Sequence, residues 1–201
     1  MPSLVGSEMC IRDRMVAGTG VTTAMQLLSN VLEGGPLTDE TPKFTVMYAA
    51  PTMDSLELVP ELTTLAQQYP EHVSLGLWVE APPPRLAGTL HGMLMPPVDT
   101  TVTATDAPRS LWQQIWTSRT PEHYSLTVRE ARVPVAVGRM AVADVATWIG
   151  RTGADRLVFV CGPNGFISAV AGPKDRDMVS QGPLGGMLAE LGLRAEEVVK
   201  L

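Results

Sequence analysis

Two periods of apolar residues alternate along the chain and predict strands separated by helices. From Val21 to Leu32, apolar residues recur at three- and four-residue spacing, which is typical of a helix that buries one face. Compact apolar runs at 44–49, 73–79 and 156–161 are typical of buried strands. Because strands that alternate with helices favour right-handed crossovers and a parallel sheet, we expect a three-layer α/β domain.

The remaining pattern is less regular. It predicts helices from Leu56 to about Tyr69, at 140–149, from near Asn164 and up to Leu191, and a last strand at 197–201. Residues 85–137 are rich in proline and threonine and lack a clear period, so we interpret them as an insertion. Within it we predict a short helix at 110–118, with Trp112 and Trp116 on one face, and a strand at 124–130.

Composition narrows the class of protein. The 201 residues include 15 Lys+Arg and 21 Asp+Glu, for a net charge of −6, so we expect no nucleic-acid partner. The two cysteines, Cys10 and Cys161, cannot form a disulfide framework, and the three histidines lack zinc-ligand spacing. We therefore expect an intracellular protein without a bound metal. No apolar run approaches the roughly 18 residues of a membrane-spanning helix, so no membrane span is expected.

The first fourteen residues, 1–14, are expected to be a non-native leader. They lack the apolar centre of a signal peptide, and Val5–Arg14 resembles translated read-through of a sequencing adapter. We therefore expect one domain over 15–201, whose first strand keeps only 15–17 of its own residues. The charges at 12–14 would then enter the central strand, where both faces are buried, so we predict marginal stability and poor cofactor retention.

A glycine turn, Gly18-Thr19-Gly20, stands where the first strand meets the first helix. Free backbone N–H groups and the helix dipole favour a phosphate at this position, and Thr19 and Thr22 add hydroxyl donors. A full dinucleotide fingerprint has a third glycine where this chain has Thr23. Phosphate binding and a plain turn therefore both remain open.

A second turn of this kind, Cys161-Gly162-Pro163, ends the clearest buried strand. If that strand is parallel to the first, its tip faces the same edge of the sheet, where a thiol could contact a flat ligand. The alternative is a core cysteine, because a free cysteine behaves as a small apolar residue. No histidine lies near either glycine turn in sequence to activate the thiol as a nucleophile.

The turn after the second strand carries Thr52, Asp54 and Ser55. Dinucleotide-binding sheets contact the adenosine ribose at this position, so all three are candidates for a ribose hydroxyl. They are equally good N-cap residues for the helix that follows. Ribose binding and capping therefore both remain open.

Taken in order, these pieces resemble the pyridine-nucleotide-binding half of the ferredoxin reductase superfamily, especially its cytochrome b5 reductase branch. The resemblance is carried by 17–22 (AGTGVT), by 48–52 (YAAPT) with 59–65, and by 158–163 (VFVCGP). A longer passage, 161–174 continued by 180–186 and 199–201, is similar to a narrower group, the mitochondrial flavoprotein linked to haem attachment on cytochrome c. Mitochondrial placement rests on this resemblance alone.

The resemblance implies a Rossmann-like parallel sheet of about five strands with helices on both faces, and an NAD(P)H-dependent flavoprotein oxidoreductase. Cys161 is the implied catalytic residue, beside the nicotinamide. The implied cofactor-binding residues are Gly18, Thr19, Gly20, Val21, Thr22, Thr52, Asp54, Ser55, Gly162, Pro163 and Asn164.

The implied cofactors are NAD(P)H and FAD, and the implied reaction passes hydride from nicotinamide to flavin. Electrons then go on to a haem protein or a similar redox acceptor, which is a candidate partner. FAD is bound mainly by a flavin-binding domain that normally lies in the same chain and that we expect to be missing from this one, so this fragment is predicted to be inactive alone.

Three positions depart from the resemblance. Thr23 stands where the superfamily usually has proline, Ser55 where an acidic residue often marks NADH preference, and Leu201 where many members end in an aromatic residue. The choice between NADH and NADPH stays open. These departures motivate an alternative, a non-catalytic nucleotide-binding or interaction domain. A methyltransferase would normally show an acid at the end of the second strand, which Tyr48-Ala49-Ala50 lacks.

Overall fold

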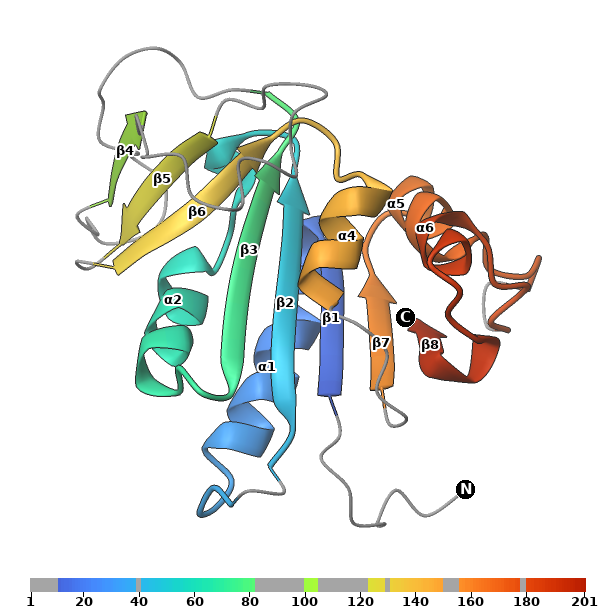
Figure 1. Cartoon of the computed structure of the whole chain (residues 1–201), viewed down its shortest axis with the longest axis horizontal. Helices are drawn as coiled ribbons and strands as arrows, with labels where there is room; N and C mark the ends of the chain where they lie inside the picture. Colours follow the sequence, from blue (N-terminus) through green and yellow to red (C-terminus); the bar gives the residue numbers. More distant parts are fainter. Residues whose placement is uncertain are drawn as a thin grey trace.

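The computed structural model describes residues 11–38, 41–81, 100–104, 123–128, 131–149, 156–177 and 180–201. In this part of the chain, eight strands form one sheet in the order β4-β5-β6-β3-β2-β1-β7-β8 (Figure 1). The strands are β1 (Ile11–Ala17), β2 (Lys43–Ala50), β3 (Val73–Val79), β4 (Thr100–Ala104), β5 (His123–Val128), β6 (Ala131–Val137), β7 (Arg156–Cys161) and β8 (Val198–Lys200).

The strands from β6 to β8 are parallel to one another, and β1 is central between β2 and β7. The expected parallel α/β sheet with the first strand at its centre is confirmed. The expected count of about five strands is too low, because β6 continues the parallel set and β4 and β5 extend it antiparallel.

The strand β6 has no counterpart among the predicted elements, because Pro134 interrupts its apolar pattern. Proline lacks an N–H for the sheet ladder. β6 pairs with β3 only from Val135 onward, so Pro134 lies before the part of the strand that is paired on that side. The insertion at 85–137 therefore contributes strands to the same sheet. The predicted helix at 110–118 lies outside the described residues.

Helices cover both faces of the sheet, as expected. They are α1 (Val21–Leu32), α2 (Val59–Gln68), α4 (Val142–Ile149), α5 (Asn164–Ala171) and α6 (Gly186–Glu190), with short 3₁₀ turns η1 (Gly18–Gly20), η2 (Met53–Ser55) and η3 (Ala195–Glu197). One apolar core joins α1 and α2 to the sheet, and a second joins α4, α5 and α6 to the opposite face (Figure 1). Alternation along the strands divides the side chains: Val16 enters the first core and Met15 the second.

The start of α2 differs from its prediction. The helix begins at Val59, after Leu58 in a left-handed conformation with φ 56°, and no side chain caps it. Asp54 and Ser55 lie in η2, several residues earlier, and Thr52 precedes η2 without capping it. The capping interpretation of these three residues is therefore wrong.

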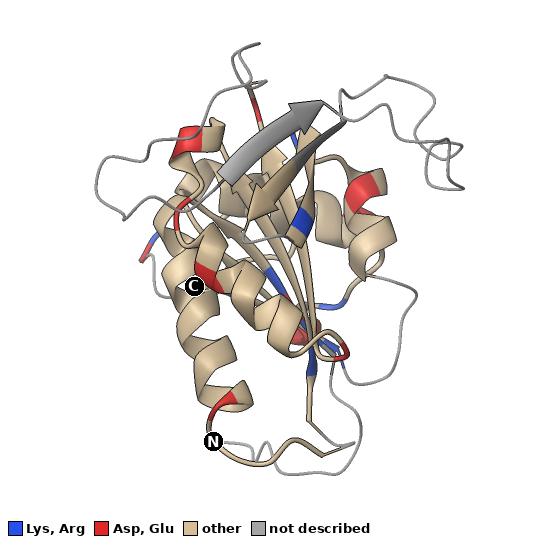
Figure 2. Ribbon diagram, turned by 90° about the vertical axis from the view of Figure 1, so that its left-hand side faces the viewer, with Lys and Arg blue, Asp and Glu red and all other residues tan. Residues whose placement is uncertain are grey.

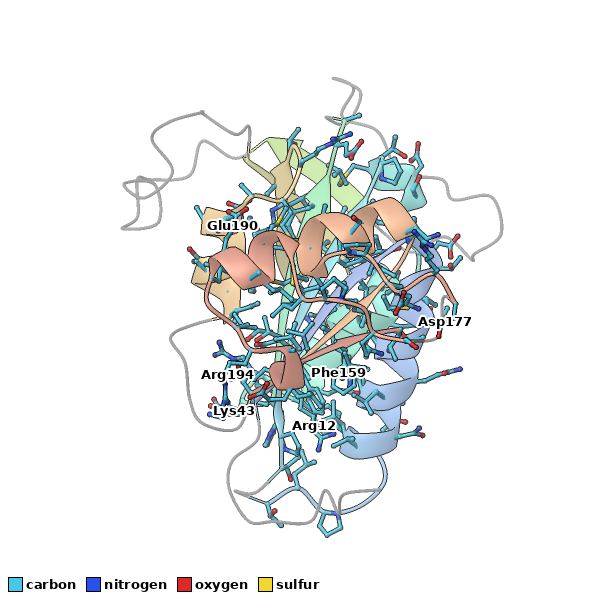
Figure 3. All side chains as sticks on the ribbon, turned by 90° about the vertical axis from the view of Figure 1, so that its right-hand side faces the viewer. Arg12, Lys43, Phe159, Asp177, Glu190 and Arg194 are labelled. Carbon is cyan, nitrogen blue, oxygen red and sulfur yellow. The ribbon has the colours of Figure 1, made fainter. Side chains whose placement is uncertain are left out.

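The amino-terminal half of β1 places charge inside the sheet. Asp13 is fully buried and Arg14 is 4% exposed, so the prediction that charges at 12–14 enter a strand buried on both faces is confirmed for these two residues. Figure 2 shows acidic and basic segments within the lower part of the sheet, and Figure 3 labels Arg12 at this end, where Lys43 of β2 pairs with Ile11. This end is opposite to the carboxyl ends of the parallel strands.

The two buried charges lie on opposite faces. Asp13 Oδ2 is 3.3 Å from Nε of the buried Arg156. Burial raises the pKa of Asp13 to about 6, although a hydrogen bond with Thr45 and the charge of Arg156 act in the other direction. On the other face, the Arg14 guanidinium lies 3.4 Å from the centre of the Phe159 ring. Burial, with a smaller effect of the Arg12 charge, lowers the pKa of Arg14 to about 9.

Candidate functional site

The three turns singled out in the sequence follow neighbouring parallel strands, so they meet at one edge of the sheet. Val16 of β1 pairs with Cys161 of β7, and Ala17 pairs with Ala49 of β2. The chain leaves these strands at η1, at 162–163 and at 51–55 respectively. Carboxyl edges of this kind are where open α/β sheets bind their ligands. The edge is the upper one in Figure 1.

The turns after β1 and β7 are in direct contact. A Cβ built on Gly20 would lie 2.5 Å from the backbone oxygen of Cys161 and 3.2 Å from its Sγ. A Cβ on Gly162 would lie 3.0 Å from that of Ala17. Only glycine therefore lets the two backbones approach so closely at position 20. The prediction that both turns face the same edge of the sheet is confirmed, and the two turns are in contact there.

Gly18 has the opposite surroundings. Its φ is +54°, which disfavours a side chain, and a Cβ built there meets no atom within 4 Å. Next to it, α1 begins at Val21 without a side-chain cap and without an acidic residue in its first turn. The turn η1 runs directly into α1, and the Val21 N–H donates to the Gly18 and Thr19 carbonyls. The N–H groups that a helix start leaves for an anion are therefore those of η1. The backbone of this turn is thus accessible to a phosphate or a flat ring.

The threonines of this turn are used in two ways. The Thr22 hydroxyl donates to the Thr19 carbonyl at 2.8 Å, and the Thr23 hydroxyl donates to the Gly20 carbonyl at 2.7 Å. The Thr22 hydroxyl, which was expected to donate to a phosphate, therefore donates to a carbonyl within the turn instead. Thr23 fixes the first turn of α1 by its side-chain hydrogen bond.

Cys161 is neither free in solvent nor part of a sealed core. It is half-buried, packs against the first apolar core, and presents Sγ toward Gly20. After it, Pro163 precedes α5, and Asn164 is the first residue of that helix, which also has no side-chain cap. The position at the strand tip matches the prediction, and the packing against the first apolar core leaves the alternative of a core cysteine open.

The turn after β2 brings Thr52 and Ser55 together. Their hydroxyl oxygens are 2.8 Å apart and exposed, while Asp54 between them is exposed as well. The Tyr48 hydroxyl donates to the Ser55 carbonyl at 3.3 Å and accepts from the Glu57 N–H at 3.0 Å. Burial raises the pKa of the Tyr48 phenol. Sequence reasoning missed Tyr48 because its partners lie seven and nine residues ahead, outside any local pattern.

The segments of the longer, unusual C-terminal passage also meet in space. The Lys200 ammonium donates to the carbonyl oxygens of Pro173 and Pro183, at 3.0 and 2.8 Å. The Gln181 side chain accepts from the Lys200 N–H at 2.6 Å and donates to its carbonyl at 3.1 Å. The glycine-rich segment between α5 and α6 is therefore held against the edge strand β8.

Neither a metal-binding cluster nor a membrane-spanning helix is found among the described residues. No group of three or more His, Cys, Asp or Glu side chains there is placed to hold a metal ion. None of the helices in the described ranges combines the length and apolar character that a bilayer crossing requires.

We compared the sequence of this chain with the sequences of known proteins. No family model matches the chain. It is 24% identical over 185 residues to NADH-cytochrome b5 reductase 2-B of Vanderwaltozyma polyspora, covering 92% of this chain and 45% of that protein. It is 48% identical over 48 residues to NADH-cytochrome b5 reductase 2 of Debaryomyces hansenii, which is 24% of this chain and 16% of that protein.

Two solved structures illustrate the similarity in fold. The cytochrome b5 reductase domain of Ulva prolifera nitrate reductase superposes with a TM-score of 0.57 at 16% identity, over 97% of this chain and 49% of that one. Flavohemoglobin from Malassezia yamatoensis, solved with FAD and heme, gives 0.51 at 14% identity, over 96% and 31%.

The fold is an α/β domain in which the turns after β1 and β7 meet at the carboxyl edge of the sheet. The chain is therefore similar in sequence to NADH-cytochrome b5 reductases and shares its fold with the two solved structures. The chain spans about half the length, or less, of the proteins that it matches.

Proposed function

We propose that this chain is the NAD(P)H-binding half of an FAD-dependent oxidoreductase. The observation that carries the proposal is the contact between the Gly18–Gly20 and Cys161–Pro163 turns, with open space in front of Gly18. A dinucleotide needs a low backbone floor at a switch point of the sheet, and these two turns supply one. Similarity to NADH-cytochrome b5 reductases supports the same coenzyme class.

The residues at this edge bind and orient rather than act as acids or bases. The N–H groups of η1, which runs directly into α1, would hold the pyrophosphate, and Thr19 adds an exposed hydroxyl. Cys161 and Gly162 would lie beside the nicotinamide and fix its distance from the flavin, while Pro163 and Asn164 shape the turn. FAD, when bound, supplies the hydride acceptor, and orientation is the protein's contribution to the rate.

FAD itself is assigned mainly to a flavin-binding domain that lies outside residues 1–201 of the same polypeptide. The further electron acceptor is proposed to be a haem protein, and the cellular site the mitochondrion. Both rest on the similarity of 161–174 and 180–186 to the narrower flavoprotein group. Flavin retained at stoichiometric level by the purified chain would contradict the assignment of FAD to another domain.

Coenzyme binding tests the proposal directly. We expect calorimetric titration of the chain with NADH or NADPH to give saturable binding to at least one of them. Gly18→Ala should weaken that binding by about tenfold or more, because the new methyl group projects into the space assigned to the ligand. Gly192→Ala is the matched control, since Gly192 also combines a positive φ (79°) with open space for a Cβ but follows α6.

The two coenzymes also decide between the functional classes. If neither NADH nor NADPH binds to a chain that melts cooperatively, the oxidoreductase proposal fails and the non-catalytic interaction domain takes its place. If one binds and Gly18→Ala has no effect, the coenzyme occupies another part of the surface.

A further inference from the structure

Tyr48 makes an unusual pair of contacts from inside the sheet. It lies in β2, two residues before the strand ends, and its side chain is fully buried in the first apolar core. Its hydroxyl nevertheless reaches the turn beyond the strand, where it donates to the Ser55 carbonyl and accepts from the Glu57 N–H. One phenol oxygen therefore ties two backbone groups of that turn to the core.

The near side of the turn is anchored independently. The Glu80 N–H donates to the Ala50 carbonyl and the Ala81 N–H to the Pro51 carbonyl, so the end of β2 is tied to the end of β3. The far side, 55–57, has only the Tyr48 hydroxyl as a hydrogen-bonding partner from the sheet within the described residues. Just beyond it, Leu58 turns the chain with a positive φ before α2 begins.

We propose that Tyr48 is a positioning residue for the adenosine ribose of the coenzyme. Its hydroxyl fixes the segment from which Ser55 presents its side chain to Thr52, at 2.8 Å, and so holds both exposed hydroxyls in one arrangement at the end of β2. This inference rests on the proposed function, because that function places the ribose at this turn. Hydroxyls held in place before binding spare the ligand the entropy of ordering them.

Tyr48→Phe isolates this role. The ring keeps its packing in the core, while the Ser55 carbonyl and the Glu57 N–H lose their common partner. The matched control is Tyr69→Phe, which removes the hydroxyl of a half-buried tyrosine at the end of α2 for which the structure describes no side-chain hydrogen bond. Thermal melting of both variants shows whether each still folds cooperatively.

Fragments of the coenzyme provide the decisive readout. We expect Tyr48→Phe to weaken ADP-ribose binding by about three- to tenfold, the effect of one or two lost hydrogen bonds, and to leave nicotinamide mononucleotide binding unchanged. Tyr69→Phe should change neither. Equal ADP-ribose affinity in Tyr48→Phe and wild type overturns the inference, and so does an equal loss for both fragments, because a general structural defect would produce it.

The wild-type chain supplies a second measurement. Amide hydrogen exchange of Glu57 should be protected in the free chain and more protected with ADP-ribose bound. Exchange as fast as in a free peptide overturns the inference whether or not the variant folds. If the wild type binds neither fragment, the proposed function fails and this inference with it. If the wild type binds ADP-ribose and Tyr48→Phe binds it with the same affinity, this inference is overturned but the proposed function is not.

Discussion

The two ends of the central strand β1 are equally buried but differ in the residues that they bury. At the carboxyl end, Met15 and Val16 are apolar and lead into a glycine turn that fits closely against β7. At the amino end, Asp13 and Arg14 are just as buried but ionisable. The difference shows that charged residues can be buried in this strand where each charge has a neighbour, Arg156 beside Asp13 and the Phe159 ring beside Arg14. The cost is visible in the shifted pKa values of both groups.

The close fit at the carboxyl end is the largest effect that we expect. Gly20→Ala should lower the free energy of unfolding by about 3 kcal/mol, since its methyl group would meet the Cys161 backbone, which cannot yield as a flexible side chain does. Urea denaturation measures the change. Gly165→Ala, inside α5 with open space around it, should instead be neutral or slightly stabilising. Equal stabilities for Gly20→Ala and wild type would show that the two turns do not touch.

The amino end should make stability depend on pH. The folded-state pKa of Asp13, about 6, is above its unfolded value of 3.8, so the folded chain binds the extra proton. Stability from this group is complete below about pH 4 and is lost as the pH rises through 6, by up to about 3 kcal/mol. We expect unfolding free energies of wild type and Asp13→Asn to differ in slope across this window. Parallel curves for the two chains would contradict the prediction.

Replacing Arg14 should change the free energy of unfolding by less than Gly20→Ala does, and should raise it rather than lower it. Arg14→Leu removes a buried charge whose Nε has no hydrogen-bond partner among the described residues, and the loss of the contact with Phe159 partly offsets the gain. We expect a net stabilisation of about 1–2 kcal/mol by urea denaturation. Arg139→Leu, an exposed residue paired with Glu80, should stay within about 0.5 kcal/mol of wild type. Destabilisation by Arg14→Leu would show that its stacking on Phe159 outweighs the cost of burial.

Much of the sheet was predictable because burial on both faces leaves a strong local signal. The strands 73–79 and 156–161 were predicted with the bounds that the structure has, and α1 likewise. β6 was missed because a proline within it hides the pattern. The start of α2 was misplaced because Leu58 adopts a left-handed backbone conformation, which the presence of a leucine does not predict.

The candidate site was predictable where topology alone determines it. Parallel neighbouring strands bring their turns to one edge, so the meeting of Gly20 and Cys161 followed from strand order. Side-chain hydrogen bonds did not follow in this way. The Thr22 hydroxyl bonds within its own turn and Tyr48 reaches across the next one, and both depend on rotamers and distances that residue spacing does not encode.

The Leu201 N–H donates to the Val160 carbonyl at 2.9 Å, which places the last residue alongside the tip of β7. A purification tag or fluorescent protein fused after Leu201 would therefore begin beside β7, close to the edge of the sheet that we propose for the coenzyme. Recombinant work on this chain is better served by a cleavable fusion, removed before any ligand is titrated.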